Sequence, residues 1–121
     1  MTVEISANFL NQGKPVSQGD VTLKACKEIP FNLEKQTPEN GLNILAHSET
    51  GHHHAVKIQD GVTVYDQDEF ISYIENKTDN VIELKHYRNF HTHAPIGIPP
   101  GKFKVTRQRE YIADGYRRAA D

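Results

Sequence analysis

Turn-forming residues recur at short intervals along the whole chain, with only short apolar segments between them. The turn signals are Gln12-Gly13, Gln18-Gly19-Asp20, Glu39-Asn40-Gly41, Thr50-Gly51, Asp60-Gly61, Lys77–Asn80, Pro99-Pro100-Gly101 and Asp114-Gly115. This spacing is typical of antiparallel β-structure. We therefore predict an all-β fold, either a small antiparallel barrel or a sandwich, with a short irregular or helical tail over residues 112–121.

The length of 121 residues is enough for one domain with its own core, and we expect a single β-domain over residues 1–121. The formal net charge of −2 gives no reason to expect the whole surface to bind nucleic acid or an anionic membrane. No apolar run is long enough to span a membrane, and the N-terminus has no signal-peptide pattern. The single cysteine, Cys26, cannot form an intrachain disulfide or a cysteine zinc cluster, so we expect a cytoplasmic protein.

Alternating apolar and polar residues predict strands over residues 20–26, 42–47, 52–59, 69–75, 81–87 and 102–111. The turn at Asp60-Gly61 is expected to close a hairpin within residues 52–66. The turn at Lys77–Asn80 is expected to close a second hairpin within residues 69–87. Residues 68–77 also fit a short helix.

All seven histidines lie between residues 47 and 93: His47, His52, His53, His54, His86, His91 and His93. Histidines that gather in one region of a folded domain usually bind a metal ion or transfer protons. The pairs His52/His54 and His91/His93 have the His-x-His spacing, which places both imidazoles on the same face of a strand. Two imidazoles side by side can share one ion, and three or four protein ligands make a zinc site.

The first pair shares its face with Val56 and Ile58, so we expect His52 and His54 to point inward and His53 to point outward. The second pair would complete the site if its segment runs beside the first strand. The predicted metal ligands are His52, His54, His91 and His93, with His47 and Glu49 as further candidates. Imidazole ligands suit zinc, iron, nickel, copper or manganese, so the spacing predicts a divalent ion without naming it. Two alternatives stay open: histidines that are solvated or satisfied within the core, and metal-free acid–base or ligand contacts.

The strand over residues 102–111 carries two arginines where apolar residues are expected. Phe103 and Val105 have inward parity, and Arg107 and Arg109 follow on the same parity. Either the strand leaves the core after Val105, or the arginines line a cavity in which they bind a carboxylate or phosphate. Residues 102–121 contain six Lys or Arg and three Asp or Glu, a local charge of +3. Nucleic acid or an acidic protein is therefore a candidate partner for this basic end.

Two stretches, HSETGHHHAV and HAPIGIPPGKFKVTRQREY, resemble a group of small uncharacterised bacterial and phage-type proteins. The group's pattern is roughly G-E-x-T-G-H-x-H, then H-A-P-L-x-L-P-P-G-x-Y-x-V-x-R-Q-R-E-Y, and QGDVTLKACKEIP is similar to its early G-D-V-L-L segment. The resemblance highlights Glu49, Thr50, Gly51, His52, His54, His93, Pro95, Pro100, Gly101, Arg107, Gln108, Arg109, Glu110 and Tyr111. This chain departs from the pattern at Ser48, where glycine is usual, and at Phe90-His91-Thr92, where the group often has His-Glu-Glu. The resemblance implies sites but no activity.

A looser similarity connects the His-x-His pair to the cupin barrel, in which such a pair, a glutamate and another histidine bind a metal ion. The Pro99-Pro100-Gly101 turn is similar to a second cupin motif. However, no glutamate stands at the usual short interval after His54, and no histidine follows Gly101. The similarity is therefore an analogy of architecture and weak support for function.

These features are compatible with three functions. The first is a small metal-binding β-domain whose ion is structural or regulatory. The second is a nucleic-acid or protein-binding module that uses the basic C-terminal strand. The third is a cupin-like metalloenzyme, with Glu49 or Glu110 as general base and with Arg107 and Arg109 holding a small anionic substrate. A homo-oligomer that shares a histidine site between subunits is compatible with the first and third.

Overall fold

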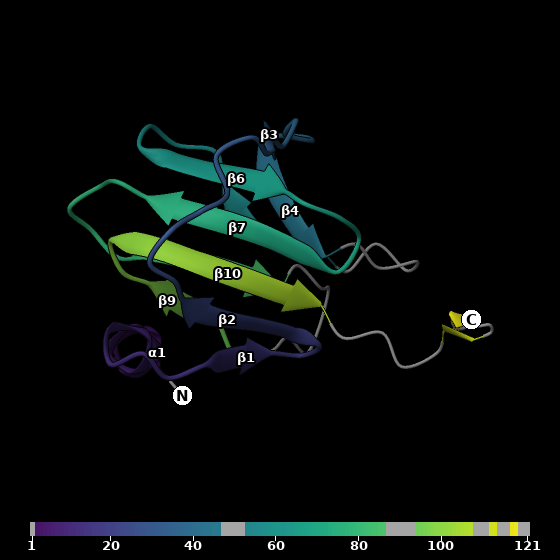
Figure 1. The fold of residues 1–121 in the computed structure, drawn as a ribbon. Helices are drawn as coiled ribbons and strands as arrows, with labels where there is room; N and C mark the ends of the chain where they lie inside the picture. The colour runs from purple at the N-terminus through teal and green to yellow at the C-terminus, as the bar shows by residue number, and fades with distance from the viewer. Residues whose placement is uncertain (1, 47–52, 87–93, 108–111, 114–116, 119–121) are drawn as a thin grey trace.

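The computed structural model describes residues 2–46, 53–86, 94–107, 112–113 and 117–118. In this part of the chain, two main antiparallel β-sheets pack face to face as a sandwich, with one short helix at the side (Figure 1). The predicted all-β fold is confirmed, and of its two forms the sandwich is present because the two sheets stay separate. Among the described residues, no helix combines the length and apolar character needed to cross a membrane.

The larger sheet has six strands in the order β1-β2-β10-β7-β6-β3. Their bounds are β1 Val16–Gln18, β2 Val21–Ala25, β10 Gly101–Arg107, β7 Ile71–Asn76, β6 Val62–Asp66 and β3 Glu34–Lys35. Strand β10 lies inside the sheet and pairs with β2 on one side and β7 on the other. The sheet therefore joins residues far apart in the chain, and Phe103 lies opposite both Ala25 and Ile74.

The smaller sheet has four strands in the order β4-β5-β8-β9. Their bounds are β4 Leu42–Ala46, β5 His54–Lys57, β8 Ile82–His86 and β9 Ile96–Ile98. The register of β4 shifts between Ile44 and Ala46, which indicates a bulge in this edge strand. The tail over residues 112–121 is predicted to be irregular or helical, but β11 Ile112–Ala113 and β12 Arg117–Arg118 form a short antiparallel pair, and the rest of the tail lies outside the described residues.

The core lies between the two sheets and is built from alternate residues of their strands. The larger sheet contributes Val21, Leu23, Val64, Ile74, Phe103 and Val105, and the smaller sheet contributes Leu45, Val56, Leu84 and Ile98. Burying each of these larger side chains stabilises the fold by roughly 1.5–3 kcal/mol. Strand β5 departs from the predicted alternation, because His54 and Ala55 are both buried. Ile58 was predicted to point inward but is exposed, since it follows the last residue of β5.

Neither predicted hairpin forms. Strands β5 and β8 belong to the smaller sheet, whereas β6 and β7 belong to the larger one. The turns at Asp60-Gly61 and Lys77–Asn80 therefore carry the chain between sheets. The Lys77 N–H donates to the Gly61 carbonyl at 2.7 Å, so these two crossing connections are bonded to each other. Turn residues predict a reversal of the chain, but they do not determine which sheet the next strand joins.

Helix α1, Val3–Asn11, is an element that the strand pattern did not predict. The Thr2 hydroxyl caps its N-terminus by accepting the Ile5 N–H at 3.1 Å. The buried residues of the helix are Ser6, Ala7 and Leu10. A helix of nine residues with only three buried positions gives a weak periodic signal in the sequence. Such a short helix is stabilised mainly by tertiary packing, which the sequence pattern does not show.

Helix α1 covers the outer edge of β9. The Ser6 hydroxyl accepts the Gly97 N–H at 2.7 Å and donates to the Val3 carbonyl at 3.0 Å. A Cβ atom at position 97 would collide with the Val3 carbonyl oxygen, so only glycine permits this close approach. The helix thus provides a partner for an edge N–H that another chain could otherwise pair with.

Candidate functional site

A buried glutamine links the two sheets next to the histidine region. Gln18, at the end of β1, is 2% exposed, and its Nε2 donates to the Leu84 carbonyl at 3.0 Å and the Ala94 carbonyl at 2.9 Å. These two bonds use both amide hydrogens, so the side-chain oxygen Oε1 faces the other way as an acceptor. Oε1 lies 2.8 Å from Nδ1 of His54. His54 therefore carries its hydrogen on Nδ1, and in the neutral ring the lone pair is on Nε2.

His54 is the first residue of β5 and is 6% exposed. Its ring stacks on that of His86, the last residue of β8, with the centroids 4.1 Å apart and the planes 3° from parallel. The two residues are direct partners in the β5–β8 register. Nε2 of His54 lies 3.8 Å from a carboxylate oxygen of Asp20, which is half exposed. The end of the smaller sheet thus holds two imidazoles beside one carboxylate.

The stacked rings do not chelate an ion in this arrangement. A nitrogen lone pair lies in the plane of its ring, so the lone pairs of two parallel rings run side by side and do not converge. If His54 and His86 are to bind the same ion, one ring has to rotate. No group of three or more His, Cys, Asp or Glu side chains able to hold a metal ion occurs among the described residues.

The other sequence-predicted site residues lie outside the described part of the chain: His47, Glu49, His52, His91, His93, Arg109 and Glu110. The described residues next to these segments are informative. Ala46 at the end of β4 pairs with His54, and His54 pairs with His86 at the end of β8. Residues 47–52 and 87–93 therefore both connect to the same end of the smaller sheet.

Arg107 bonds to protein oxygens at the end of β10. Its Nε donates to the Glu69 carbonyl at 2.7 Å, and Nη2 donates to the Asp68 carbonyl at 2.7 Å. Its Nη1 donates to the Leu45 carbonyl at 2.7 Å and to the Ser72 hydroxyl at 2.9 Å. The guanidinium thus ties β10 to the β6–β7 turn and to β4 of the other sheet. These bonds give Arg107 a structural role, and anion binding by this residue stays a prediction.

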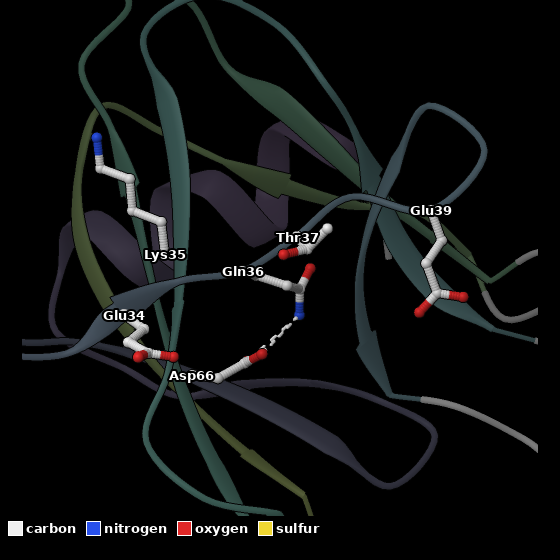
Figure 2. Close-up of a pocket in the computed structure, with 6 residues that line it drawn as sticks. All are labelled: Glu34, Lys35, Gln36, Thr37, Glu39 and Asp66. Carbon is white, nitrogen blue, oxygen red and sulfur yellow. Dashed lines mark hydrogen bonds between the residues drawn. The ribbon is translucent and has the colours of Figure 1, made fainter.

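An open groove of about 330 Å³ lies beside β3, lined by Glu34, Lys35, Gln36, Thr37, Glu39 and Asp66 (Figure 2). Nε2 of Gln36 donates to the Ile44 carbonyl at 2.7 Å and lies 3.2 Å from each carboxylate oxygen of Asp66. Figure 2 shows Lys35 pointing away from Asp66 and Glu39 standing apart from both. Glu34 lies directly opposite Asp66 in the β3–β6 pairing, but no group of three or more potential metal ligands forms among the described residues of this groove.

Cys26 lies just after β2 and is partly buried. Burial raises the pKa of its thiol, and the nearby Lys102 and Lys104 oppose this rise to a smaller extent. A raised pKa keeps the thiol protonated near neutral pH, so Cys26 has no activated thiolate. This environment is that of a structural cysteine.

Sequence reasoning missed three residues of the histidine site. Gln18 and Asp20 lie in a stretch that we interpreted as a turn signal, and nothing local indicates their distant contacts. His86 did carry a signal, because it shares the parity of the buried residues Ile82 and Leu84. An inward-facing histidine at a strand end could have been added to the candidate site.

Fold and site together define a small antiparallel β-sandwich with a buried histidine at one end of its smaller sheet. The chain belongs to the family described as Domain of unknown function (DUF8820), which matches residues 17–108. The match contains Gln18, His54 and His86, whereas α1 precedes it. No curated protein and no solved structure matches the chain.

Proposed function

We propose that this chain is a small metal-binding β-domain in which Nε2 of His54 is a ligand. The bond of 2.8 Å between Nδ1 of His54 and Oε1 of Gln18 carries this proposal. Histidines that bind metals usually donate their other ring N–H to a carbonyl or carboxylate, which fixes the tautomer and the orientation of the ring. Gln18 performs this function for His54, and its own amide is held by two backbone carbonyls.

The remaining ligands in this proposal come from the sequence pattern. His52, His91 and His93 are the first candidates, and His47 and Glu49 are the next. The support for this set is that the described ends of β4, β5 and β8 pair with one another next to both segments. Such an imidazole-rich set suits zinc, iron, nickel or manganese. An ion held there would add a link between strand ends that backbone pairing and the stacked rings of His54 and His86 already join, which favours a structural or regulatory ion.

One observation on the described residues bears on the proposed enzyme function. Arg107 already donates to carbonyl groups, which weakens the support for an enzyme that holds an anionic substrate with this residue. The metal-binding proposal therefore has the stronger geometric support.

For localisation we propose the cytoplasm, because the single cysteine is compatible with a reducing compartment.

The test is a metal analysis of untagged protein purified without a nickel column. Plasma mass spectrometry is expected to find about one equivalent of a divalent ion in the wild type, as for a single site. His54→Ala is expected to lose this ion. His53→Ala is the matched control, because it removes the adjacent imidazole, which we predict to lie on the opposite face. Wild-type protein that stays metal-free after incubation with each candidate ion would contradict the proposal, as would loss of metal in both variants.

A further inference from the structure

The outer face of the larger sheet carries a row of polar residues that the histidine site does not use. Strand register places Lys35, Tyr65, Tyr73, Lys104 and Lys24 directly opposite one another across β3, β6, β7, β10 and β2. In β6, β7, β10 and β2 their neighbours along the strand fill the core, so this row faces away from the smaller sheet. The three lysines of the row are exposed.

Positive charge is concentrated where β2 and β10 meet. Lys24 lies directly opposite Lys104, and Lys102 is on the same face of β10 two residues away. Both β10 lysines act on the thiol of Cys26, which supports their placement beside the end of β2. In the described part of this strand pair and its neighbour β7, the only acidic side chain on this face is Glu75, opposite Lys102. The net charge of this surface is therefore positive, although the whole chain carries −2.

Lysines placed directly opposite each other on neighbouring strands repel and destabilise a sheet. The pair Lys24 and Lys104 is therefore unfavourable for folding alone. A bound anion would relieve this repulsion, so the pair is better explained by binding than by stability. We call Lys24, Lys102 and Lys104 the lysine patch.

The segment that crosses this face carries an exposed aromatic residue. The segment between β2 and β3 has to cross β10, β7 and β6, and Figure 1 shows it passing in front of these strands. Tyr73 on the outer side of β7 is buried, whereas Phe31 in the crossing segment is 98% exposed. A ring exposed to this degree contributes nothing to the core, but both of its faces are open to a planar ligand.

We infer that the outer face binds single-stranded nucleic acid, with phosphates on the lysine patch and a base stacked on Phe31. Proteins that bind single strands without sequence preference combine a positive surface for the backbone with aromatic rings for the bases. A duplex does not fit this arrangement, because its bases are already stacked and paired. The lysines supply point charges and no planar hydrogen-bonding fork, so the expected binding is independent of base sequence.

The test uses fluorescence anisotropy with a labelled oligothymidylate of about 12 nucleotides, a length typical of such sites. A chelator is present throughout, so the result does not depend on the proposed metal site. If three phosphates are neutralised, the slope of log K against log salt is expected to be about −2. Phe31→Ala is expected to weaken binding by about 5- to 100-fold while leaving this slope unchanged.

The double variant Lys24→Ala/Lys104→Ala is expected to weaken binding at least about tenfold and to reduce the slope to about −0.7, as for one remaining phosphate contact. Lys57→Ala/Lys85→Ala is the matched control, because it removes the same charge from strands β5 and β8 of the smaller sheet and is expected to bind like the wild type. The inference is overturned by equal losses in the two double variants, by a Phe31→Ala variant that binds normally, or by absence of binding at low salt. It is also overturned if duplex DNA, a polyglutamate peptide or anionic vesicles bind more tightly than the oligonucleotide.

Discussion

Two buried carboxamides join the sheets at opposite ends of the sandwich, and they differ in what their oxygens accept. Gln18 and Asn76 are both 2% exposed. Each donates two hydrogen bonds from its amide nitrogen to backbone carbonyls: Gln18 to Leu84 and Ala94, and Asn76 to Asn80 and Ile98.

The groups that bond to the side-chain oxygens show that Asn76 has a structural role, whereas Gln18 contacts the candidate site. Oδ1 of Asn76 accepts the N–H of Thr78 at 3.0 Å and its hydroxyl at 2.6 Å, so it stabilises a turn. Oε1 of Gln18 faces an imidazole, a group that can bind a metal ion or a proton. The two amide nitrogens therefore make similar hydrogen bonds, but one oxygen stabilises a turn and the other orients a histidine ring.

The largest expected effect is the loss of the structural amide. Asn76→Leu leaves buried carbonyls and the Thr78 N–H without this partner, and we expect it to lower the free energy of unfolding by about 3 kcal/mol. Urea unfolding measures this change. The loss is expected to be the same with and without added metal, and a metal-dependent loss would contradict the proposed division between the two ends.

Gln18→Leu tests the other end. It is expected to lower the free energy of unfolding by about 2 kcal/mol, because it removes the three hydrogen bonds described for Gln18 and Asn76→Leu removes four. It is also expected to weaken metal binding by about 10- to 100-fold through loss of the His54 acceptor. Isothermal titration with zinc, compared with Asn76→Leu as the matched control, separates the two effects. Equal zinc affinity in the two variants would show that Gln18 does not orient a ligand.

Arg107→Lys extends the comparison to a cationic link between the sheets. Lysine keeps the charge but cannot reproduce a planar fork that bonds to Leu45, Asp68 and Glu69. We expect a loss of about 1–2 kcal/mol in thermal or urea unfolding. Unchanged stability combined with lost stabilisation by added phosphate would favour the anion-binding prediction for this residue.

The smallest expected effect concerns the exposed β6–β7 turn. The Phe70 N–H, donated to Asp68 at 2.8 Å, is the main cause that lowers the pKa of this carboxyl, and the Ile71 N–H adds to it. A lowered folded-state pKa stabilises the fold above the unfolded value of about 3.9, and this stabilisation disappears as the pH falls through the folded pKa. Asp68→Asn is therefore expected to reduce Tm slightly at pH 7 and to have less effect in strong acid. A Tm difference that grows on acidification would contradict this sign.

Most of the longer strands could be predicted from the sequence, but the short strands β1, β3 and β9 and the strand partners could not. Phe103 and Val105 show their inward faces through simple alternation with lysine and threonine. The turns at Asp60-Gly61 and Lys77–Asn80 look like hairpin turns, yet both cross between sheets. The same turn residues occur in hairpin turns and in connections between sheets. Only long-range packing decides which of the two forms.

The candidate site could be predicted only in part for a related reason. The His-x-His spacing indicated His54, because strand parity is a local property. Gln18, Asp20 and His86 reach His54 through pairing between strands that are distant in the chain. No spacing rule connects such residues before the topology is known.

The position of β10 has a consequence for how the protein reaches its fold. This strand follows every other strand of the larger sheet in chain order, yet it separates β2 from β7 and completes the sheet. During synthesis β2 can pair only with β1 until β10 has emerged from the ribosome. Loop closure over so long a separation is costly in entropy, so we expect refolding in roughly the millisecond-to-second range. During that interval the apolar residues Val21 and Leu23 are exposed to other chains, and refolding yield should fall as protein concentration rises.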